Sequence, residues 1–474
     1  MRKNRGIIFL FGLILLLIGL KIPTLSLPYF WDEAWPYSTA VHLLFENGLS
    51  LFPGAVPFDI SRGHPLFFHF MNAAAWHVFG NSITGSHIFP LLISILLMLV
   101  NYIFCRTFFS EKVAIIASAI LLVQPVFLAQ SALLLPEMLV ALLSLLTIYS
   151  FLKNNTWAYL LFGTLLLLTK ESGIVAILSC GFWQLIELFA IKKNKYSLKN
   201  DVKKIVIICI PIILTSLFFI LQKIKTGYFF LPLYTNGDNF LISSILEKLK
   251  NYSAYLFIYQ GRNVLSFALI ISLLVFFLIK KIKLKTAQSK IILVLSFFVV
   301  FYLLFSSANF YSPRYLLTIL VPFIIIVSFF VTEITSSNKL LFYPAVLLIL
   351  GVGIYFCFDK KHVSDHSLSY VDAIAVSQEM TRYCQKENLQ DKNIVANFLM
   401  RTYLTDKYSG YVSQENLFKN VQVNATDNTE YLIQTNFEKL EFLEQLKNTK
   451  KLKLIKRFEK NYCFSEIYKV ENPQ

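Results

Sequence analysis

Long apolar runs alternate with short polar segments over most of the chain, up to about residue 357. Most of these runs hold roughly 18–22 residues, which is the length that an α-helix needs to cross about 30 Å of hydrocarbon. The pattern predicts about eleven membrane-spanning helices, at 7–27, 87–108, 112–130, 132–152, 156–170, 172–190, 203–221, 262–280, 289–308, 313–332 and 339–357. We therefore expect a polytopic α-helical membrane protein.

Two aromatic segments between these runs have a less regular pattern. The segment 66–80, "LFFHFMNAAAWHVFG", is short for a span and rich in histidine. We interpret it as a helix in the membrane interface, where His69, Trp76 and His77 reach water. The segment 226–240, "TGYFFLPLYTNGDNF", fits either a groove for the acceptor or a lipid, or an interfacial aromatic belt.

The pattern changes after the last apolar run, where the runs shorten and charged residues become frequent. Residues 369–390 and 438–451 have helical periodicity, 393–399 and 430–437 are typical of buried strands, and 452–470 is typical of a hairpin. We expect residues 1–357 to form a transmembrane domain with a large outer loop at 28–86, and 358–474 to form a small soluble α/β domain. The latter contains no obvious reacting residues, so we expect an accessory role. Its two cysteines, Cys384 and Cys463, could pair in an oxidising compartment.

Composition and charge agree with a membrane protein and indicate its orientation. The 474 residues are 56% hydrophobic, with a mean hydropathy of +0.59, which exceeds the usual range of soluble domains. The net charge of +16 comes largely from short basic runs beside spans, at 1–5, 191–204 and 280–285. These runs do not fit nucleic-acid binding. By the positive-inside rule they predict a cytoplasmic N-terminus in the inner (cytoplasmic) cell membrane and, with an odd number of spans, an extracytoplasmic C-terminal domain.

That topology gathers the charged residues of the membrane part at the outer face. Asp32 and Glu33 follow the first span, between Trp31 and Trp35, and Arg62 and His64 lie later in the same loop. Three more charged residues stand at outer span ends: Glu137, Lys170 and Arg314. Charged side chains near hydrocarbon are costly, so a convergent set of acids and bases predicts a site for a charged, membrane-borne ligand.

Most of these residues also have a structural interpretation. His64 could be a loop residue held by Pro65. Asp32 and Glu33 fit the solvated start of an interfacial helix. Glu137 follows Pro136 at a helix start, and Lys170 could snorkel to the interface. Arg314 follows Pro313 in the same way, although a cation at a helix N-terminus opposes the helix dipole.

The order of the motifs resembles a known family. It comprises "WDEA" at 31–34, "GHPLFF" at 63–68, "LPEMLVALL" at 135–143, "LTKESG" at 168–173 and "SPRYLLTILVPFIII" at 312–326. Together these motifs resemble the C-type membrane glycosyltransferases, in particular the branch of the protein O-mannosyltransferases and lipid A aminoarabinose transferases. The resemblance implies a sugar donor carried on dolichyl or undecaprenyl phosphate.

The resemblance also implies roles for the individual residues. Asp32 would be the catalytic base, with Glu33 as its neighbour. His64, Lys170 and Arg314 would lie at the donor phosphate. Arg62, Glu137 and Tyr315 complete the expected substrate-binding set, and Glu137 stands where the family more often has Asp.

The chemistry expected at such a site follows from its donor. A lipid-linked phosphate leaves as a stable anion, so cations to stabilise it matter more than a strong general acid. A carboxylate takes the proton of the acceptor hydroxyl or amine. One base and one backside attack predict inversion at the sugar carbon, because a double displacement would need a second carboxylate nearby and adjacent residues such as Asp32 and Glu33 usually point apart. The acceptor could be a lipid, a glycan or a protein.

Two alternatives remain open from the sequence. Asp32, Glu33, Glu137 and His64 offer ligands of the type that bind a divalent metal ion, although without a compact ligand spacing. A transporter or flippase of lipid-linked sugars would also place charges on the path of the lipid. Transporters, however, tend to show internal repeats and charges at the membrane midplane, and this sequence shows neither.

Overall fold

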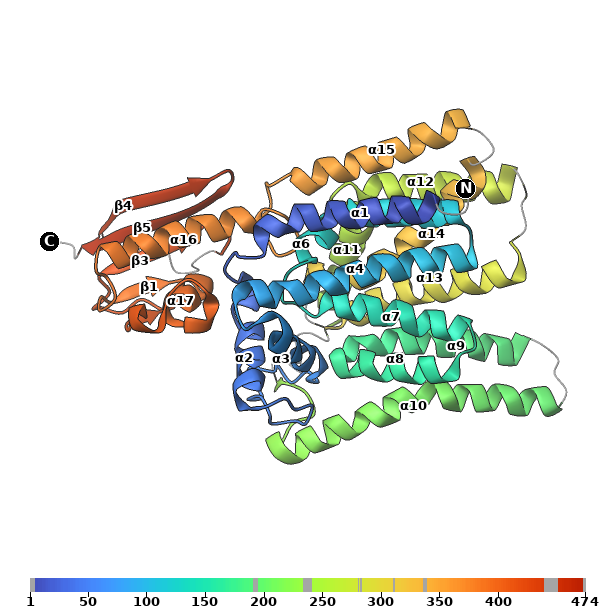
Figure 1. Ribbon diagram of the computed structural model, residues 1–474, viewed down its shortest axis with the longest axis horizontal. Helices are drawn as coiled ribbons and strands as arrows, with labels where there is room; N and C mark the ends of the chain where they lie inside the picture. Colours follow the sequence, from blue (N-terminus) through green and yellow to red (C-terminus); the bar gives the residue numbers. More distant parts are fainter. Residues whose placement is uncertain are drawn as a thin grey trace.

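A computed structural model describes residues 5–190, 195–232, 241–279, 281, 284–309, 312–335, 339–438 and 451–471. A bundle of long helices occupies one end of the molecule and a small sheet with two helices occupies the other (Figure 1). The first helix starts at the end of the bundle that lies away from the sheet. The chain therefore begins and ends at opposite ends of the long axis.

The bundle contains the apolar helices of the membrane part, which differ widely in length. They are α1 (Arg5–Lys21), α4 (Ile83–Phe108), α5 (Glu111–Leu122), α6 (Pro125–Gln130), α7 (Glu137–Leu152), α8 (Thr156–Thr169), α9 (Ile174–Ala190), α10 (Lys195–Thr226), α12 (Arg262–Leu274), α13 (Thr286–Ser307), α14 (Leu317–Thr335) and α15 (Lys339–Phe358). Within the described residues, 8 segments are long and apolar enough to cross a membrane, and α7 and α8 are shorter apolar helices. The number eleven thus stays a prediction.

The predicted span 112–130 is two helices, α5 and α6. The break falls at Gln124, whose backbone is extended (φ −88°, ψ 125°) ahead of Pro125, the first residue of α6. Proline disfavours the helical conformation of the residue before it and cannot donate a helical hydrogen bond. The prediction of one span followed the apolar composition of 112–130 and overlooked the Gln124–Pro125 pair, which marks the break.

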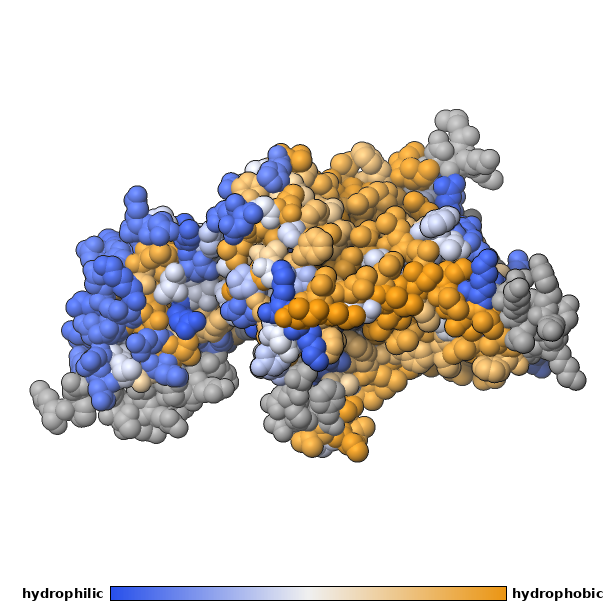
Figure 2. Space-filling model, turned by 90° about the horizontal axis from the view of Figure 1, so that it is seen from below, coloured by the Kyte–Doolittle hydropathy of each residue, from blue (hydrophilic) through white to orange (hydrophobic). Residues whose placement is uncertain are grey.

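The bundle has an inward core and an apolar outer surface. The central helix α14 is almost completely enclosed and packs against α5, α7, α12 and α13. On the outside, Leu217 of α10, Ile270 of α12 and Leu347 of α15 each expose more than half of their surface. Figure 2 shows this apolar surface over the helical part, whereas the opposite end of the molecule is mainly polar. The chain is therefore a multi-pass membrane protein, because soluble proteins rarely expose apolar surface on this scale.

The loop between α1 and α4 folds against the end of the bundle nearer the sheet (Figure 1). It contains η3 (Trp31–Glu33), α2 (Tyr37–Asn47) and α3 (Phe67–Phe79). The predicted helix at 66–80 is thus present, but His69 and Trp76 are buried, contrary to prediction. The ring of His69 stacks on Tyr37 and Trp76 packs against His42, so α2 covers the side of α3 that we expected in water.

The part of the chain after α15 forms the sheet, in the strand order β2-β1-β3-β5-β4. Its elements are α16 (Tyr370–Lys386), β1 (Ile394–Ala396), α17 (Phe398–Thr405), β2 (Val421–Gln422), β3 (Tyr431–Thr435), β4 (Lys451–Lys460) and β5 (Cys463–Glu471). β1 pairs in parallel with β2 and β3, and β5 pairs antiparallel with β3 and β4. The predicted helix, the strand at 430–437 and the hairpin are present, whereas the strand predicted at 393–399 ends at Ala396 and the chain continues as α17 from Phe398. The helix expected at 438–451 falls largely outside the described residues. Cys384 and Cys463 are both free thiols.

Candidate functional site

The centre of the site is the buried guanidinium of Arg314, which is 2% exposed. It projects from η8 (Pro313–Leu316), the short turn that leads into α14. One terminal nitrogen, Nη2, donates to Asp32 of η3, and the other, Nη1, donates to Asp365, which follows α15. The third nitrogen, Nε, lies 3.5 Å from Oε1 of Glu137, the first residue of α7. Four segments far apart in the sequence therefore meet at one side chain.

Lys170 supplies a second cation beside Arg314. It lies between α8 and η4 (Glu171–Gly173), and its Nζ donates to Oε1 of Glu137 at 3.0 Å. The same nitrogen lies 3.9 Å from the centre of the Tyr315 ring. Both cations thus share the Glu137 carboxylate, as buried charges require partners to offset their desolvation.

The loop that carries Arg62 and His64 completes the polar rim. Nδ1 of His64 lies 2.9 Å from the carboxylate of Glu171, and the Arg62 guanidinium stacks over Trp35 at 5.6 Å. Between them, Gly63 has φ +71°, and a Cβ there would lie 3.0 Å from the backbone nitrogen of Leu231. Only glycine fits this backbone and this close approach, so Gly63 determines where His64 points.

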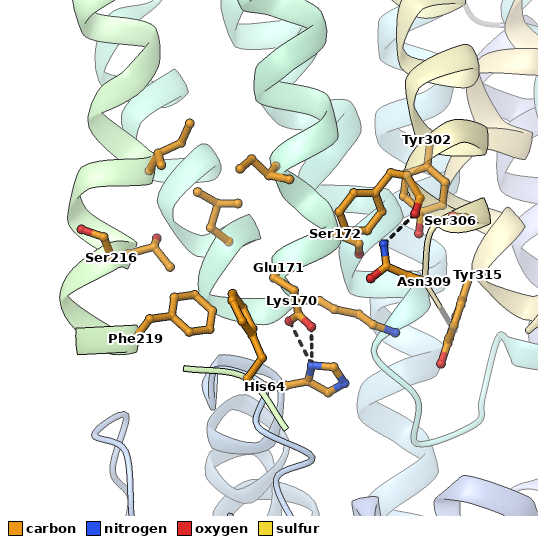
Figure 3. A pocket seen from close by; sticks show the side chains of 16 residues that line it. His64, Lys170, Glu171, Ser172, Ser216, Phe219, Tyr302, Ser306, Asn309 and Tyr315 are labelled. Carbon is orange, nitrogen blue, oxygen red and sulfur yellow. Dashed lines mark hydrogen bonds and ion pairs between the residues drawn. The ribbon is translucent and has the colours of Figure 1, made fainter. Parts of the chain in front are cut away.

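The first of two adjoining cavities lies between the membrane helices and has a volume of about 460 Å³. Its polar end has His64, Lys170 and Tyr315, and Figure 3 shows Lys170 extending from beside the His64–Glu171 pair toward Tyr315. Most of the lining surface is apolar. The other lining residues come from α8, η4, α9, α10 and α13 and from the segments after α10 and α13: Leu167, Glu171, Ser172, Ile174, Ile212, Thr215, Ser216, Phe219, Phe230, Tyr302, Phe305, Ser306 and Asn309. We call this space the inner cavity.

The second space, the outer cavity, has a volume of about 290 Å³ and is far more polar. Its lining side chains come from the first loop, η8 and the segment after α15: Trp31, Asp32, Pro36, Tyr37, Arg62, His64, Ser312, Pro313, Arg314, Tyr315, Ser364, Asp365 and His366. His64 and Tyr315 line both cavities. An apolar space among membrane helices therefore adjoins a charged chamber at these two residues.

The structure brings together most of the residues predicted from the sequence. The outer cavity is lined by Asp32, Arg62, His64, Arg314 and Tyr315, and Lys170 lines the inner one. Glu137 lines neither cavity and instead holds the two cations in place.

Glu33 lies outside both cavities, although the sequence predicted it in the catalytic set with Asp32. Its carboxylate is completely buried, with Oε1 3.2 Å from Nε2 of His87 and Oε2 accepting a hydrogen bond from the backbone of Phe30 at 3.1 Å. The backbone N–H of Leu134 also donates to it. Glu33 thus joins η3 to α4 and to the loop before α7, on the side of η3 away from the outer cavity. Its geometry is that of a structural carboxylate rather than a reacting one.

Sequence reasoning missed Asp365 and His366. Asp365 is 6% exposed, and its Oδ1 lies 3.6 Å from Nδ1 of His366. Burial raises the pKa of Asp365, but the charges of Arg314 and His366 more than offset this and lower it to about 2. The acid–histidine pair lies in the polar segment after α15, where the sequence predicted no reacting residues.

Two further expectations concern the surroundings of the site. Phe230 of the aromatic segment 226–240 lines the inner cavity, which favours the groove over the belt for this residue, whereas 233–240 lie outside the described residues. Across the described ranges, no three His, Cys, Asp or Glu side chains are grouped as metal ligands would be. The possible divalent ion stays a prediction.

Comparisons with known proteins agree with this architecture. The family described as dolichyl-phosphate-mannose-protein mannosyltransferase matches residues 63–221. No curated protein matches the sequence. ArnT from Cupriavidus metallidurans bound to undecaprenyl phosphate has a similar structure, with a TM-score of 0.55 and 11% identity over 98% of this chain and 98% of that chain.

A second solved structure extends the similarity. The archaeal oligosaccharyltransferase AglB from Archaeoglobus fulgidus, in complex with an inhibitory peptide and a dolichol-phosphate, has a TM-score of 0.51 and 11% identity over 91% of this chain and 69% of that chain. At such identities the likeness shows the fold. The predicted fold class, a polytopic helical protein with a small C-terminal α/β part, and the resemblance to the C-type glycosyltransferases are both confirmed.

Proposed function

We propose that this chain, which shares its fold with polyprenyl-phosphate-dependent glycosyltransferases, transfers a sugar from a polyprenyl phosphate to an acceptor with inversion. The observation that carries the proposal is the junction of the two cavities at His64 and Tyr315. A lipid-linked sugar needs an apolar path for its tail and a charged chamber for its head, and these two spaces supply them side by side.

The donor phosphate would lie at this junction. Lys170 and His64 reach it from the inner cavity and Arg314 from the outer one. Cations placed where charge develops on the leaving phosphate stabilise the transition state, because that charge grows as the bond to the sugar breaks. The isoprenoid tail then extends among α8, α9 and α10, in contact with residues such as Ile212 and Phe219.

Asp32 is the base in this arrangement. Its side chain is 34% exposed in the outer cavity, so an acceptor can approach it, whereas Glu33 is completely buried elsewhere. The Asp32 carboxylate takes the proton of the acceptor hydroxyl or amine while that atom attacks the sugar carbon from the side opposite the phosphate.

Inversion follows from the state of the other carboxylate in the outer cavity. Asp365 is bound by Arg314 and flanked by His366, and its pKa of about 2 makes it a poor nucleophile. A double displacement would need a second, free carboxylate close to the sugar. One direct displacement with Asp32 as base is therefore the better-supported route.

The cell topology of the proposal follows from the basic loops. The N-terminus lies on the cytoplasmic side of the cell membrane, and the transfer site and residues 358–474 lie on the opposite side. A lipid, glycan or protein acceptor of the cell envelope is available there. A reporter that is active only in the cytoplasm and is fused after residue 474 should give no signal. A strong signal there would contradict this orientation.

The proposal is tested with purified protein in lipid nanodiscs and a radiolabelled sugar on undecaprenyl or dolichyl phosphate. We expect time-dependent appearance of free polyprenyl phosphate together with transferred or hydrolysed sugar, and no release by the Asp32→Asn protein. A flippase, which no observation here favours, would move the donor across a vesicle membrane and leave it intact. Intact donor after incubation across a panel of lipid-linked sugars would refute the transferase proposal.

A further inference from the structure

The segment after α15 contributes side chains to the outer cavity that the mechanism above does not fully explain. Ser364, Asp365 and His366 line it, although they follow the last membrane helix and precede the sheet. The side chain of Asp365 is only 8% exposed, and its carboxylate lies between the Arg314 guanidinium and the His366 ring. A buried carboxylate is costly unless its partners hold it firmly, so this position has a function or a strong structural reason.

The three nitrogens of Arg314 face three different carboxylates. Nη2 faces Asp32, Nη1 faces Asp365, and Nε lies 3.5 Å from Glu137. Among these partners, Asp32 is the most exposed at 34%, against 8% for Asp365 and 2% for Glu137. A phosphate that enters the cavity therefore competes with Asp32 for Nη2, and an acceptor competes with Nη2 for Asp32. The more buried contact between Nη1 and Asp365 persists.

We infer that Asp365 is a positioning residue, which holds the Arg314 guanidinium toward the donor phosphate while Asp32 turns to the acceptor. This inference rests on the proposed function. It assigns to the chain beyond the last membrane helix a direct part in the geometry of transfer, rather than only an accessory role. With Nη1 bound to Asp365 and Nε beside Glu137, the planar guanidinium is held at two points, so Nη2 keeps a defined direction for a phosphate contact.

A purely electrostatic role for Asp365 makes the opposite prediction for the donor. The carboxylate adds a negative charge to a chamber that must bind an anion, so neutralising it should by itself tighten donor binding and lower KM. Loss of positioning instead lowers kcat, because a misaligned guanidinium stabilises the leaving phosphate less well in the transition state. The split between KM and kcat distinguishes the two.

The test compares Asp365→Asn with a matched control, Asp372→Asn. Asp372 lies in α16, is 1% exposed, and is ion-paired with Lys360 at 2.8 Å, but it lines neither cavity. Transfer is measured with labelled undecaprenyl- or dolichyl-phosphate sugar at matched amounts of folded protein. We expect Asp365→Asn to lose at least tenfold in kcat with donor KM unchanged, Asp365→Glu to recover most of the loss, and Asp372→Asn to keep kcat near wild type.

A double variant adds an independent readout. If Asp365 acts through Arg314, the combined Asp365→Asn and Arg314→Lys protein should lose little more than the worse single variant, because both changes remove the same alignment. The inference would be overturned if the fold-loss of the double variant equalled the product of the two single losses. It would also be overturned by equal kcat in Asp365→Asn and Asp372→Asn, and in both cases the transferase function would stand. A wild-type protein that releases no sugar would instead overturn the proposed function, and the inference with it.

Discussion

Asp32 and Arg314 are 282 positions apart in the sequence and form an ion pair in the wall of the outer cavity. The pair joins the base that we propose to the cation that we propose for the phosphate. In this pair Arg314 occupies Oδ2 of the Asp32 carboxylate, so that oxygen is not open to an acceptor. We therefore expect donor binding to weaken this pair, since the phosphate is a second anion for Arg314, and so to prepare Asp32 for the acceptor only when the donor is present.

Arg314→Lys tests the geometry of the cation while keeping its charge. Lysine offers a point charge in place of a planar fork and cannot contact Asp32, Asp365 and a phosphate together. We expect transfer to fall at least tenfold, or about 1.4 kcal/mol in transition-state stabilisation, in a protein that still folds. Transfer at the wild-type rate would mean that the fork of Arg314 has no part in the reaction.

The inner cavity makes a prediction about the lipid tail. Ile212 of α10 lines it, whereas the next residue, Ile213, is 60% exposed and lines neither cavity. Ile212→Trp should raise the KM of a long polyprenyl donor by at least tenfold, because the larger side chain occupies the space that the long tail needs. The KM of a short-chain analogue, which does not need this space, should change much less. Ile213→Trp should change neither value. Equal effects of both variants on both donors would remove the tail from this cavity.

Glu33→Gln tests whether Glu33, unlike its neighbour Asp32, contributes to stability and not to the transfer rate. An amide has one acceptor oxygen where Glu33 uses two, at His87 and at the backbone of Phe30 and Leu134. Leaving a buried group without its partner costs about 1–3 kcal/mol. We expect a lower unfolding temperature and, in the folded fraction, transfer within about threefold of wild type. A stable Glu33→Gln protein with a rate loss of a hundredfold or more would show that Glu33 takes part in the chemistry.

The pKa of Asp365 predicts how stability depends on pH. Its folded value of about 2 lies below the usual 3.8, so the stabilisation, about 2 kcal/mol, is fully present above about pH 4 and is lost as the pH falls through about 2. The difference in unfolding temperature between wild type and Asp365→Asn should narrow as the pH falls from about 4 to about 2. A difference that stays the same down to about pH 2 would contradict the lowered pKa of Asp365.

The charged residues of the membrane part were predictable because each stands out against an apolar background. Lys170 and Arg314 at span ends are costly without anions, so their positions and a common topology were enough to expect them together. Their shared partner Glu137 was expected to bind substrate, whereas it holds both cations. Sequence alone does not show whether a charged side chain faces a cavity or another charged side chain, since that depends on packing between helices.

Asp365 was missed for the converse reason. In a polar segment an acidic residue beside a histidine is not costly, so it does not stand out from its neighbours. Asp365 has a role only because the folded chain places it against Arg314. The direction of Glu33 depends on how η3 packs between His87 and Leu134, which are distant in sequence. Similarly, the burial of His69 depends on Tyr37 of another helix. Local periodicity carries no information on such contacts.

The central claim is that Asp32 takes the proton of an acceptor that attacks a lipid-borne sugar. Asp32→Asn keeps the size of the side chain and a hydrogen-bond acceptor for Arg314 but removes the base. The decisive measurement is the single-turnover transfer rate of this variant from a labelled polyprenyl-phosphate sugar, with donor binding and folding verified separately. We predict normal folding, donor affinity within a few-fold of wild type, and a rate lower by about 10²–10⁴. A folded Asp32→Asn protein that binds donor and transfers sugar at nearly the wild-type rate would contradict the claim.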